Sequence, residues 1–162
     1  MAILDQLAFA ATLTAAIGSG VIGGVFFAFS VFIMRALARL PSAEGIAAMQ
    51  AINVTVLTPL FLGTFVGTAA VGGASVLFTL MRWGDAPFLC RLLGTMLYAV
   101  GTFGVTTVFN VPRNNALAAI SPTAPEVEDH WRRYLHEWTA WNHVRTVAAL
   151  AAAVSFTLAL AS

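Results

Sequence analysis

The chain has 162 residues, of which 59% are hydrophobic and 9% are charged, and its formal net charge is +1. Soluble domains carry about 25% charged residues, and a domain this small needs them because so much of its surface stays wet. The composition therefore excludes a soluble enzyme, a disordered tail and a nucleic-acid-binding protein, and it indicates an integral membrane protein.

Four charge-free runs predict membrane-spanning helices, because a helix needs about 20 apolar residues to cross the hydrocarbon. The runs cover residues 6–34, 45–81, 92–112 and 146–162. We expect spans at about 7–34, 57–81, 89–110 and 142–161, with an interfacial segment at 43–56 before the second span. The sequence thus predicts one domain over residues 1–162, an all-α integral membrane four-helix up-down bundle.

Proline and capping signals predict where these helices begin and end. Pro41 and Ser42 end the first helix, and Pro59 predicts a kink inside the second run. Residues 82–85 form a short polar turn, and residues 123–126, Thr-Ala-Pro-Glu, form a capping box. A fourth helix that starts near 124 is about 55 Å long at 1.5 Å per residue, so its first third projects beyond the bilayer.

Two G-x-x-x-G steps predict close helix packing, one at Gly20 and Gly24 and one at Gly63 and Gly67. Such steps let helix backbones approach each other in a membrane. They fit packing within the chain, and they also leave room for a homo-oligomer that forms through the glycine faces or for assembly with another membrane protein.

The arginines predict an orientation in a cell membrane. Most of those near helix ends fall on connections one and three, namely Arg35, Arg39, Arg113, Arg132 and Arg133. Basic residues favour the cytoplasmic side. We therefore expect a multi-pass protein with connections one and three in the cytoplasm and both termini outside.

Polar and aromatic side chains gather at one end of the predicted bundle. They include Gln50, Asn53, Asn110, Asn114, Trp138, Trp141, Asn142, His143 and Arg145. At 100° per residue, Trp138, Trp141 and Arg145 share one face of the fourth helix, Asn142 flanks it and His143 lies on another. An aromatic belt at the membrane surface explains the indoles without a ligand, whereas an aromatic-lined binding site also explains the amides on other helices.

The individual polar residues leave similar alternatives open. Arg145 either reaches toward the membrane surface or makes a cation–π contact and recognises an anion. Asn53 and Asn110 either hold helices together or mark a functional site at membrane depth.

Metal and cofactor motifs are missing from the sequence. His130, His136 and His143 are six and seven residues apart, whereas two ligands on one helix normally sit four residues apart. The sequence also lacks a dinucleotide fingerprint, a P-loop and a C-x-x-C-H motif. We therefore expect no metal site and no cofactor.

Four ordered segments carry a resemblance that spans nearly the whole chain. They are residues 24–30 (GVFFAFS), 49–61 with the Asn53 and Pro59 positions, 110–117 with Asn-Val-Pro-Arg-Asn, and 138–146 (WTAWNHVRT). Together they resemble the anthrone oxygenase-like family of small four-helix membrane proteins, most of whose bacterial members are domains of unknown function. The resemblance implies oxidation of an anthrone to an anthraquinone without a metal or flavin.

This chemistry is compatible with the residues at the polar end. An anthrone has an acidic methylene whose carbanion reacts directly with oxygen. Under this hypothesis His143 is the base, since neutral imidazole titrates near physiological pH. Arg145, Asn110 and Asn142 stabilise the enolate, and Trp138 and Trp141 stack on the flat ring. Asn53 and Asn114 are further substrate-binding candidates.

Two non-catalytic functions are also open at this stage. A protein that binds a quinone or another flat lipid would use the same aromatic face without chemistry. An assembly partner would use the glycine faces instead. In every case we expect the lipid bilayer as a partner and no nucleic acid. For the oxygenase and for the quinone-binding protein we also expect a hydrophobic aromatic small molecule as a ligand.

Overall fold

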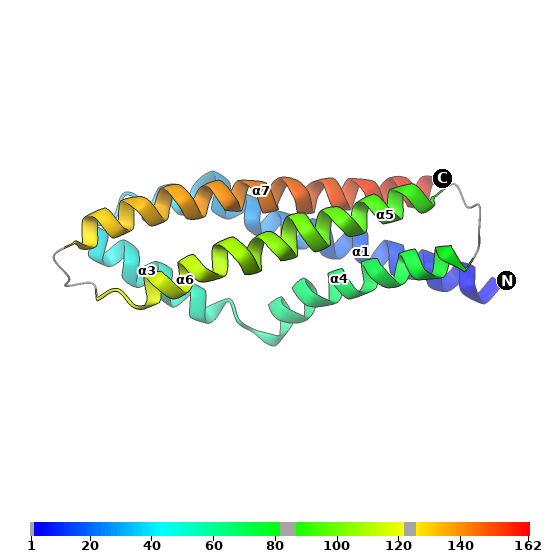
Figure 1. Cartoon of the computed structure of the whole chain (residues 1–162), viewed down its shortest axis with the longest axis horizontal. Coiled ribbons are helices and arrows are strands. Elements are labelled where there is room, and N and C mark those ends of the chain that lie inside the picture. The colour runs from blue at the N-terminus through cyan, green and yellow to red at the C-terminus, as the bar shows by residue number, and fades with distance from the viewer. Residues whose placement is uncertain (1, 82–86, 122–125) are drawn as a thin grey trace.

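The computed structural model describes residues 2–81, 87–121 and 126–162. The described residues are almost entirely helical and contain no strand, which confirms the all-α membrane bundle. Four helices are long and apolar enough to cross a membrane: Ile3–Leu37, Pro59–Leu80, Phe88–Ala118 and Val127–Ala161. They run up and down along the long axis of the molecule, and both termini lie at the same end (Figure 1).

Two of these spans, the first and the third, are continuous only when their π-helical segments are counted, and a separate short helix precedes the second. The first consists of α1 (Ala2–Ala28), η1 (Phe29–Ile33) and α2 (Met34–Leu37). The second, α4 (Pro59–Leu80), follows the shorter α3 (Ser42–Thr55). The third consists of α5 (Phe88–Met96), η2 (Leu97–Gly104), η3 (Thr106–Asn110) and α6 (Val111–Ala118). The fourth is the single helix α7 (Val127–Ala161).

Helix α7 packs against both the first and the third spans. A stripe of its buried side chains recurs at steps of three or four residues, which is the spacing of one helix face. The stripe runs Trp131, Tyr134, Trp138, Asn142, Arg145, Ala149, Ala152, Phe156 and Ala159. With 35 residues, α7 is about 52 Å long at 1.5 Å per residue, so it exceeds the hydrocarbon thickness of about 30 Å.

The proline at position 59 separates two helices instead of kinking one. Helix α3 ends at Thr55, and Pro59 is the first residue of α4. The Thr58 hydroxyl caps the new helix by accepting from the Phe61 backbone N–H at 3.2 Å. A proline at the first helical position lacks a backbone N–H that would have no partner within the helix anyway. Starting a new helix at Pro59 therefore costs less free energy than keeping this proline inside a kinked helix. The turn expected at 82–85 and most of the capping box expected at 123–126 lie outside the described residues.

Glycines permit close helix contacts, but not at the expected pairs. A Cβ at Gly101 would lie 2.6 Å from the Ala148 Cβ, so η2 and α7 touch there through almost bare backbone. A Cβ at Gly20, Gly24, Gly63 or Gly67 would meet nothing within 4 Å. The G-x-x-x-G steps therefore do not pack within the chain, and a homo-oligomer through them stays a prediction.

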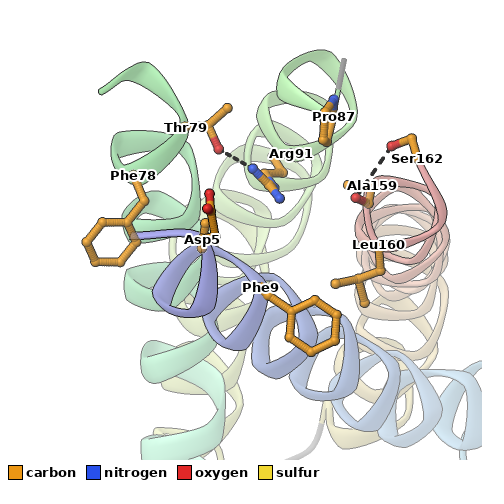
Figure 2. Close-up of a pocket in the computed structure, with 10 residues that line it drawn as sticks. Asp5, Phe9, Phe78, Thr79, Pro87, Arg91, Ala159, Leu160 and Ser162 are labelled. Atoms are coloured by element: carbon orange, nitrogen blue, oxygen red, sulfur yellow. Dashed lines mark hydrogen bonds between the residues drawn. The ribbon is translucent and has the colours of Figure 1, made fainter. Parts of the chain in front are cut away.

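A polar cluster closes the end of the bundle that holds the termini (Figure 2). Arg91 of α5 is buried and donates a hydrogen bond to the Thr79 hydroxyl of α4. Figure 2 shows the Asp5 side chain of α1 directed toward these two residues. The cluster lines a cavity of about 290 Å³ and brings three helices together at this end.

The packing at Gly101 predicts that the same glycine-to-alanine substitution has different effects on stability at Gly101 and at Gly63. Gly101→Ala should lower the melting temperature in detergent, because an overpacked contact costs about 1–3 kcal/mol. Gly63→Ala, the matched control, should leave it unchanged or raise it, since alanine favours a helix over glycine by about 0.5–1 kcal/mol. Circular dichroism during heating measures both. A Gly101→Ala protein that melts at or above the wild-type temperature would contradict the described η2–α7 contact.

Candidate functional site

Arg145 is a buried cation near the middle of α7. It is 5% exposed and belongs to the buried stripe of that helix. Its Nε donates to the Asn142 Oδ1 at 2.9 Å, and its Nη1 lies 3.4 Å from the Thr106 hydroxyl of η3. The guanidinium is therefore held in place by one helix turn of α7 and by the third span.

Two aromatic rings flank the same guanidinium. The Arg145 Cζ lies 3.9 Å from the Phe26 ring centroid and 4.8 Å from the Trp138 ring centroid. Each cation–π contact contributes about 0.5–2 kcal/mol, with the larger values where water is excluded. The rings stabilise the cation and also fix the plane of its donors.

No carboxylate neutralises Arg145 among the residues that the structure describes. In that part of the chain Arg113 pairs with Glu137, and Arg132 pairs with Glu128 and Asp129, whereas Arg145 forms no such ion pair. A buried charge without a counter-charge is costly. An anion placed beside this guanidinium would therefore be strongly stabilised.

Asn142 connects Arg145 to the first span. Its Nδ2 donates to the Phe26 carbonyl at 2.8 Å and to the Ser30 hydroxyl at 2.7 Å, while its Oδ1 accepts from Arg145. Ser30 lies in η1, and its hydroxyl is also 3.1 Å from the Thr146 hydroxyl. Asn142 thus orients the cation instead of facing a ligand. The π-helical segments η1 and η3 both supply partners here, in agreement with the frequent placement of π-bulges at functional sites.

A cavity of about 170 Å³ lies against this cation. Its polar wall contains Arg145, Trp138, Asn53, Asn114 and two threonines, and its apolar wall includes Phe26, Phe29, Phe61 and Phe65. An engineered apolar cavity of about 150 Å³ holds benzene. The space therefore accommodates one aromatic ring with small substituents, with a cation at its wall.

The two amides of the wall have different hydrogen-bond states. The Asn114 Oδ1 accepts from the Tyr134 hydroxyl at 2.9 Å and from the Trp138 Nε1 at 2.7 Å. The Asn53 Nδ2 is buried beside the Tyr134 hydroxyl but forms no hydrogen bond of normal geometry with the described residues. Because a buried donor is seldom left unpaired, Asn53 is the amide that has a free donor for a ligand.

Exposed apolar side chains mark where the cavity opens. Leu57 is 61% exposed, and Leu62 and Val111 are each 40% exposed, although all three line the cavity. They lie where α3 passes into α4 and where α6 begins. The opening therefore lies between the second and third spans and is apolar.

Besides Asn142, three of the expected site residues do not line this cavity. Asn110 is buried, and its Nδ2 donates to the Trp138 carbonyl at 3.2 Å, which ties η3 to α7. Trp141 stacks on Phe109 with a centroid distance of 3.6 Å. His143 is exposed and lines a different groove. The expectation that His143 and Trp141 share one substrate site with Arg145 is therefore not supported by their placement.

The cavity also depends on residues that the sequence did not single out for the site. Phe26 flanks the cation from α1, Thr106 contacts it from η3, and Tyr134 fixes Asn114. Tyr134 lies four residues before Trp138 and therefore on the same helix face, and that spacing was the available signal. Phe26 carried no comparable signal, because phenylalanine is common in every apolar run.

The described residues offer no metal site. Across 2–81, 87–121 and 126–162, no group of three or more His, Cys, Asp or Glu side chains lies close enough to hold a metal ion. The chemically distinctive group of the cavity is the guanidinium, whose planar donors suit an anionic oxygen.

Comparison with known protein families gives a match to part of the chain. The sequence model of a family described as anthrone oxygenase matches residues 59–155, which is more than half of the chain. This range holds α4, the third span and α7 up to Ser155, and so includes Asn114, Trp138 and Arg145. No curated protein and no solved structure matches the chain.

The network around Asn142 predicts a large loss of stability on truncation. Asn142→Ala removes two donated hydrogen bonds and leaves the Arg145 Nε without its acceptor, and each buried unpaired group costs about 1–3 kcal/mol. Asn115→Ala, at an exposed asparagine of α6, is the matched control and should be neutral. Thermal unfolding in detergent measures both. Equal melting temperatures for the two variants would show that the network does not hold the site together.

Proposed function

Because this chain belongs to the anthrone oxygenase family, we propose that it binds the anion of a hydrophobic aromatic enol or phenol at Arg145 and promotes its reaction with molecular oxygen. The observation that carries this proposal is the buried guanidinium on the cavity wall, which no carboxylate of the described residues neutralises. An enolate or phenolate oxygen is the counter-charge that such a site favours.

The reaction of an anthrone-type ketone balances without any further reagent. Loss of a methylene proton gives the enolate, whose oxygen accepts from Arg145 and from the Asn53 amide. The carbanion carbon then forms a bond to one oxygen atom of O₂, and a proton converts the product to a hydroperoxide. Loss of water from that hydroperoxide gives the quinone carbonyl. One O₂ is consumed and one water is released for each ketone oxidised.

The proton of the substrate leaves to water in this proposal. Of the described residues, those that line the cavity include no carboxylate and no imidazole. Arg145 instead lowers the energy of the anion, so that a water molecule at the polar wall inside the cavity, beside the Asn53 and Asn114 amides, suffices as the acceptor. His143 stays outside the mechanism, because its side chain lies on the outer surface.

The shape of the cavity supports access from the membrane. Leu57, Leu62 and Val111 form an apolar mouth, which suits a substrate dissolved in lipid. The volume of about 170 Å³ admits one ring, so a larger flat molecule extends its other rings through the mouth. A hydroquinone-like ring fits entirely inside.

A second candidate function is binding of a quinone or another flat lipid without turnover. The lack of an acid–base side chain among the described lining residues favours it, because Arg145 and Asn53 also suit a neutral carbonyl oxygen. Saturable binding without oxygen uptake would distinguish this function from the first.

We further propose that the Arg145 cavity faces the cytoplasmic leaflet of a cell membrane. Arg35 lies in the last turns of the first span and Arg39 just after it, Arg113 lies in α6, and Arg132 and Arg133 lie in the first turns of α7. These segments are at the end of the bundle opposite the two termini (Figure 1). The positive-inside rule supports this orientation.

Oxygen consumption by the purified protein tests the catalytic proposal, with anthrone and a hydroquinone as separate substrates. Arg145→Met should lower the rate about 100-fold or more, the usual loss for an oxyanion donor. Asn53→Ala should lower it about 10-fold or more without changing the melting temperature, because the Asn53 Nδ2 forms no hydrogen bond of normal geometry with the described residues. This second variant keeps the test valid if Arg145→Met fails to fold.

The control for this test is Asn115→Ala, which should keep the full rate. An Asn53→Ala protein with unchanged rate and unchanged melting temperature would contradict the assignment of the cavity. Binding of either compound without oxygen uptake by the wild type would select the second candidate function.

Reporter fusions test the proposed orientation in a bacterial host. Alkaline phosphatase attached after Ser162 should be active, and green fluorescent protein at the same position should be dark, because each reporter works on only one side of the membrane. The same reporters attached after residue 40 should give the opposite pattern. Fluorescence of the fusion after Ser162 would show that the protein has the opposite orientation and would contradict the proposal.

A further inference from the structure

A second cavity lies on the outside of the bundle, between the end of the first span and α7. Its volume is about 500 Å³. Arg35 and Ala38 line it from one side, and Arg132, His136, Ala140 and His143 line it from α7. We refer to it as the α2–α7 groove. It shares no residue with the Arg145 cavity.

The α2–α7 groove is lined by basic and titratable side chains and by no acidic one of the described residues. Arg35, His136 and His143 make no ion pair within the described part of the chain. Arg132 is paired with Glu128 and Asp129, which lie about one turn earlier on α7, at 3.6 and 3.0 Å. The positive charge available to a ligand therefore comes from Arg35 across the groove, and the imidazoles of His136 and His143 add hydrogen-bonding groups.

In the membrane orientation proposed above, the groove falls at the depth of the lipid headgroups. Arg35 is near the end of the first span, and His143 is immediately before the apolar second half of α7. From Arg132 to His143 the groove extends about 16 Å along α7 at 1.5 Å per residue. The headgroup region on each side of the hydrocarbon is about 5–8 Å thick, so the groove spans this region and reaches the start of the acyl chains.

We propose that the α2–α7 groove binds the phosphodiester of an anionic phospholipid. Arg35 supplies planar donors that pair with phosphate oxygens, and His136 adds a donor from the opposite wall. Ala38 and Ala140 leave room for the glycerol between the two helices. Basic pockets between spans at the cytoplasmic surface are typical sites for anionic headgroups.

Lipid selectivity of the full chain in nanodiscs tests this site. The probes are spin-labelled phosphatidylglycerol and spin-labelled phosphatidylcholine, and the readout is the immobilised fraction of each. The wild type should prefer phosphatidylglycerol, and the double change Arg35→Gln with His136→Gln should reduce that preference about fivefold or more, because the arginine charge is lost. The matched control, Arg39→Gln with His130→Gln, changes the same residue types outside the groove and should keep the preference.

Two further measurements distinguish a lipid ligand from free phosphate and from a loss of folding. Ala140→Trp fills the groove without removing a charge and should also abolish the preference, which keeps the test valid if the double variant melts early. Equal immobilisation of the two lipids by the wild type would overturn the proposal. Displacement of the labelled phosphatidylglycerol by millimolar inorganic phosphate at constant ionic strength would show that the groove takes free phosphate instead, and would overturn the assignment to lipid.

Discussion

The structure depends on the burial of one guanidinium among four apolar spans. Arg145 is held by the side-chain oxygen of Asn142 and lies between two rings, Phe26 and Trp138. Hydrogen bonds and ring contacts offset part of the cost of removing a cation from water, but they supply no negative charge. Binding of an anionic oxygen lowers the remaining free-energy cost. The residue that destabilises the empty fold therefore stabilises a bound anion.

Every span contributes to this arrangement. The first supplies Phe26 and Ser30, the third supplies Thr106, and α7 supplies the cation with its amide. Helix α3 and the start of α4 close the cavity with Asn53 and an apolar mouth. Two of the partners lie in π-helical segments, where the altered helix winding brings side chains and carbonyls to positions that a regular α-helix does not provide. The far end of the bundle is closed separately, by the cluster around Arg91 (Figure 2).

The sequence predicted the four-helix bundle and the end at which polar groups gather, because low charge and long apolar runs are properties of composition. It predicted part of the inward face of α7, which Trp138 and Arg145 share, but not the inward faces of the other spans. In lipid, an apolar side chain is equally suited to the interior and to the outer surface, and exposed Val147 of α7 is as apolar as buried Ala149. Hydrophobic periodicity therefore could not show that Asn142 belongs to the inner stripe, that Trp141 stacks on Phe109, or that His143 lies outside. The same ambiguity explains why Gly63 and Gly67 face open space while Gly101 makes the close contact.

The ionisation of a bound phenol tests the central claim most directly, namely that the cavity beside Arg145 stabilises an anion. A nitrophenol changes its absorption when it ionises, so the fraction present as phenolate can be read while it is bound to the protein. At a pH where the free phenol is mostly neutral, the account predicts that the bound phenol is mostly phenolate in the wild type and neutral in Arg145→Met. A bound phenol that is more neutral than the free one in the wild type would show that the cavity behaves as an apolar pocket and would contradict the account.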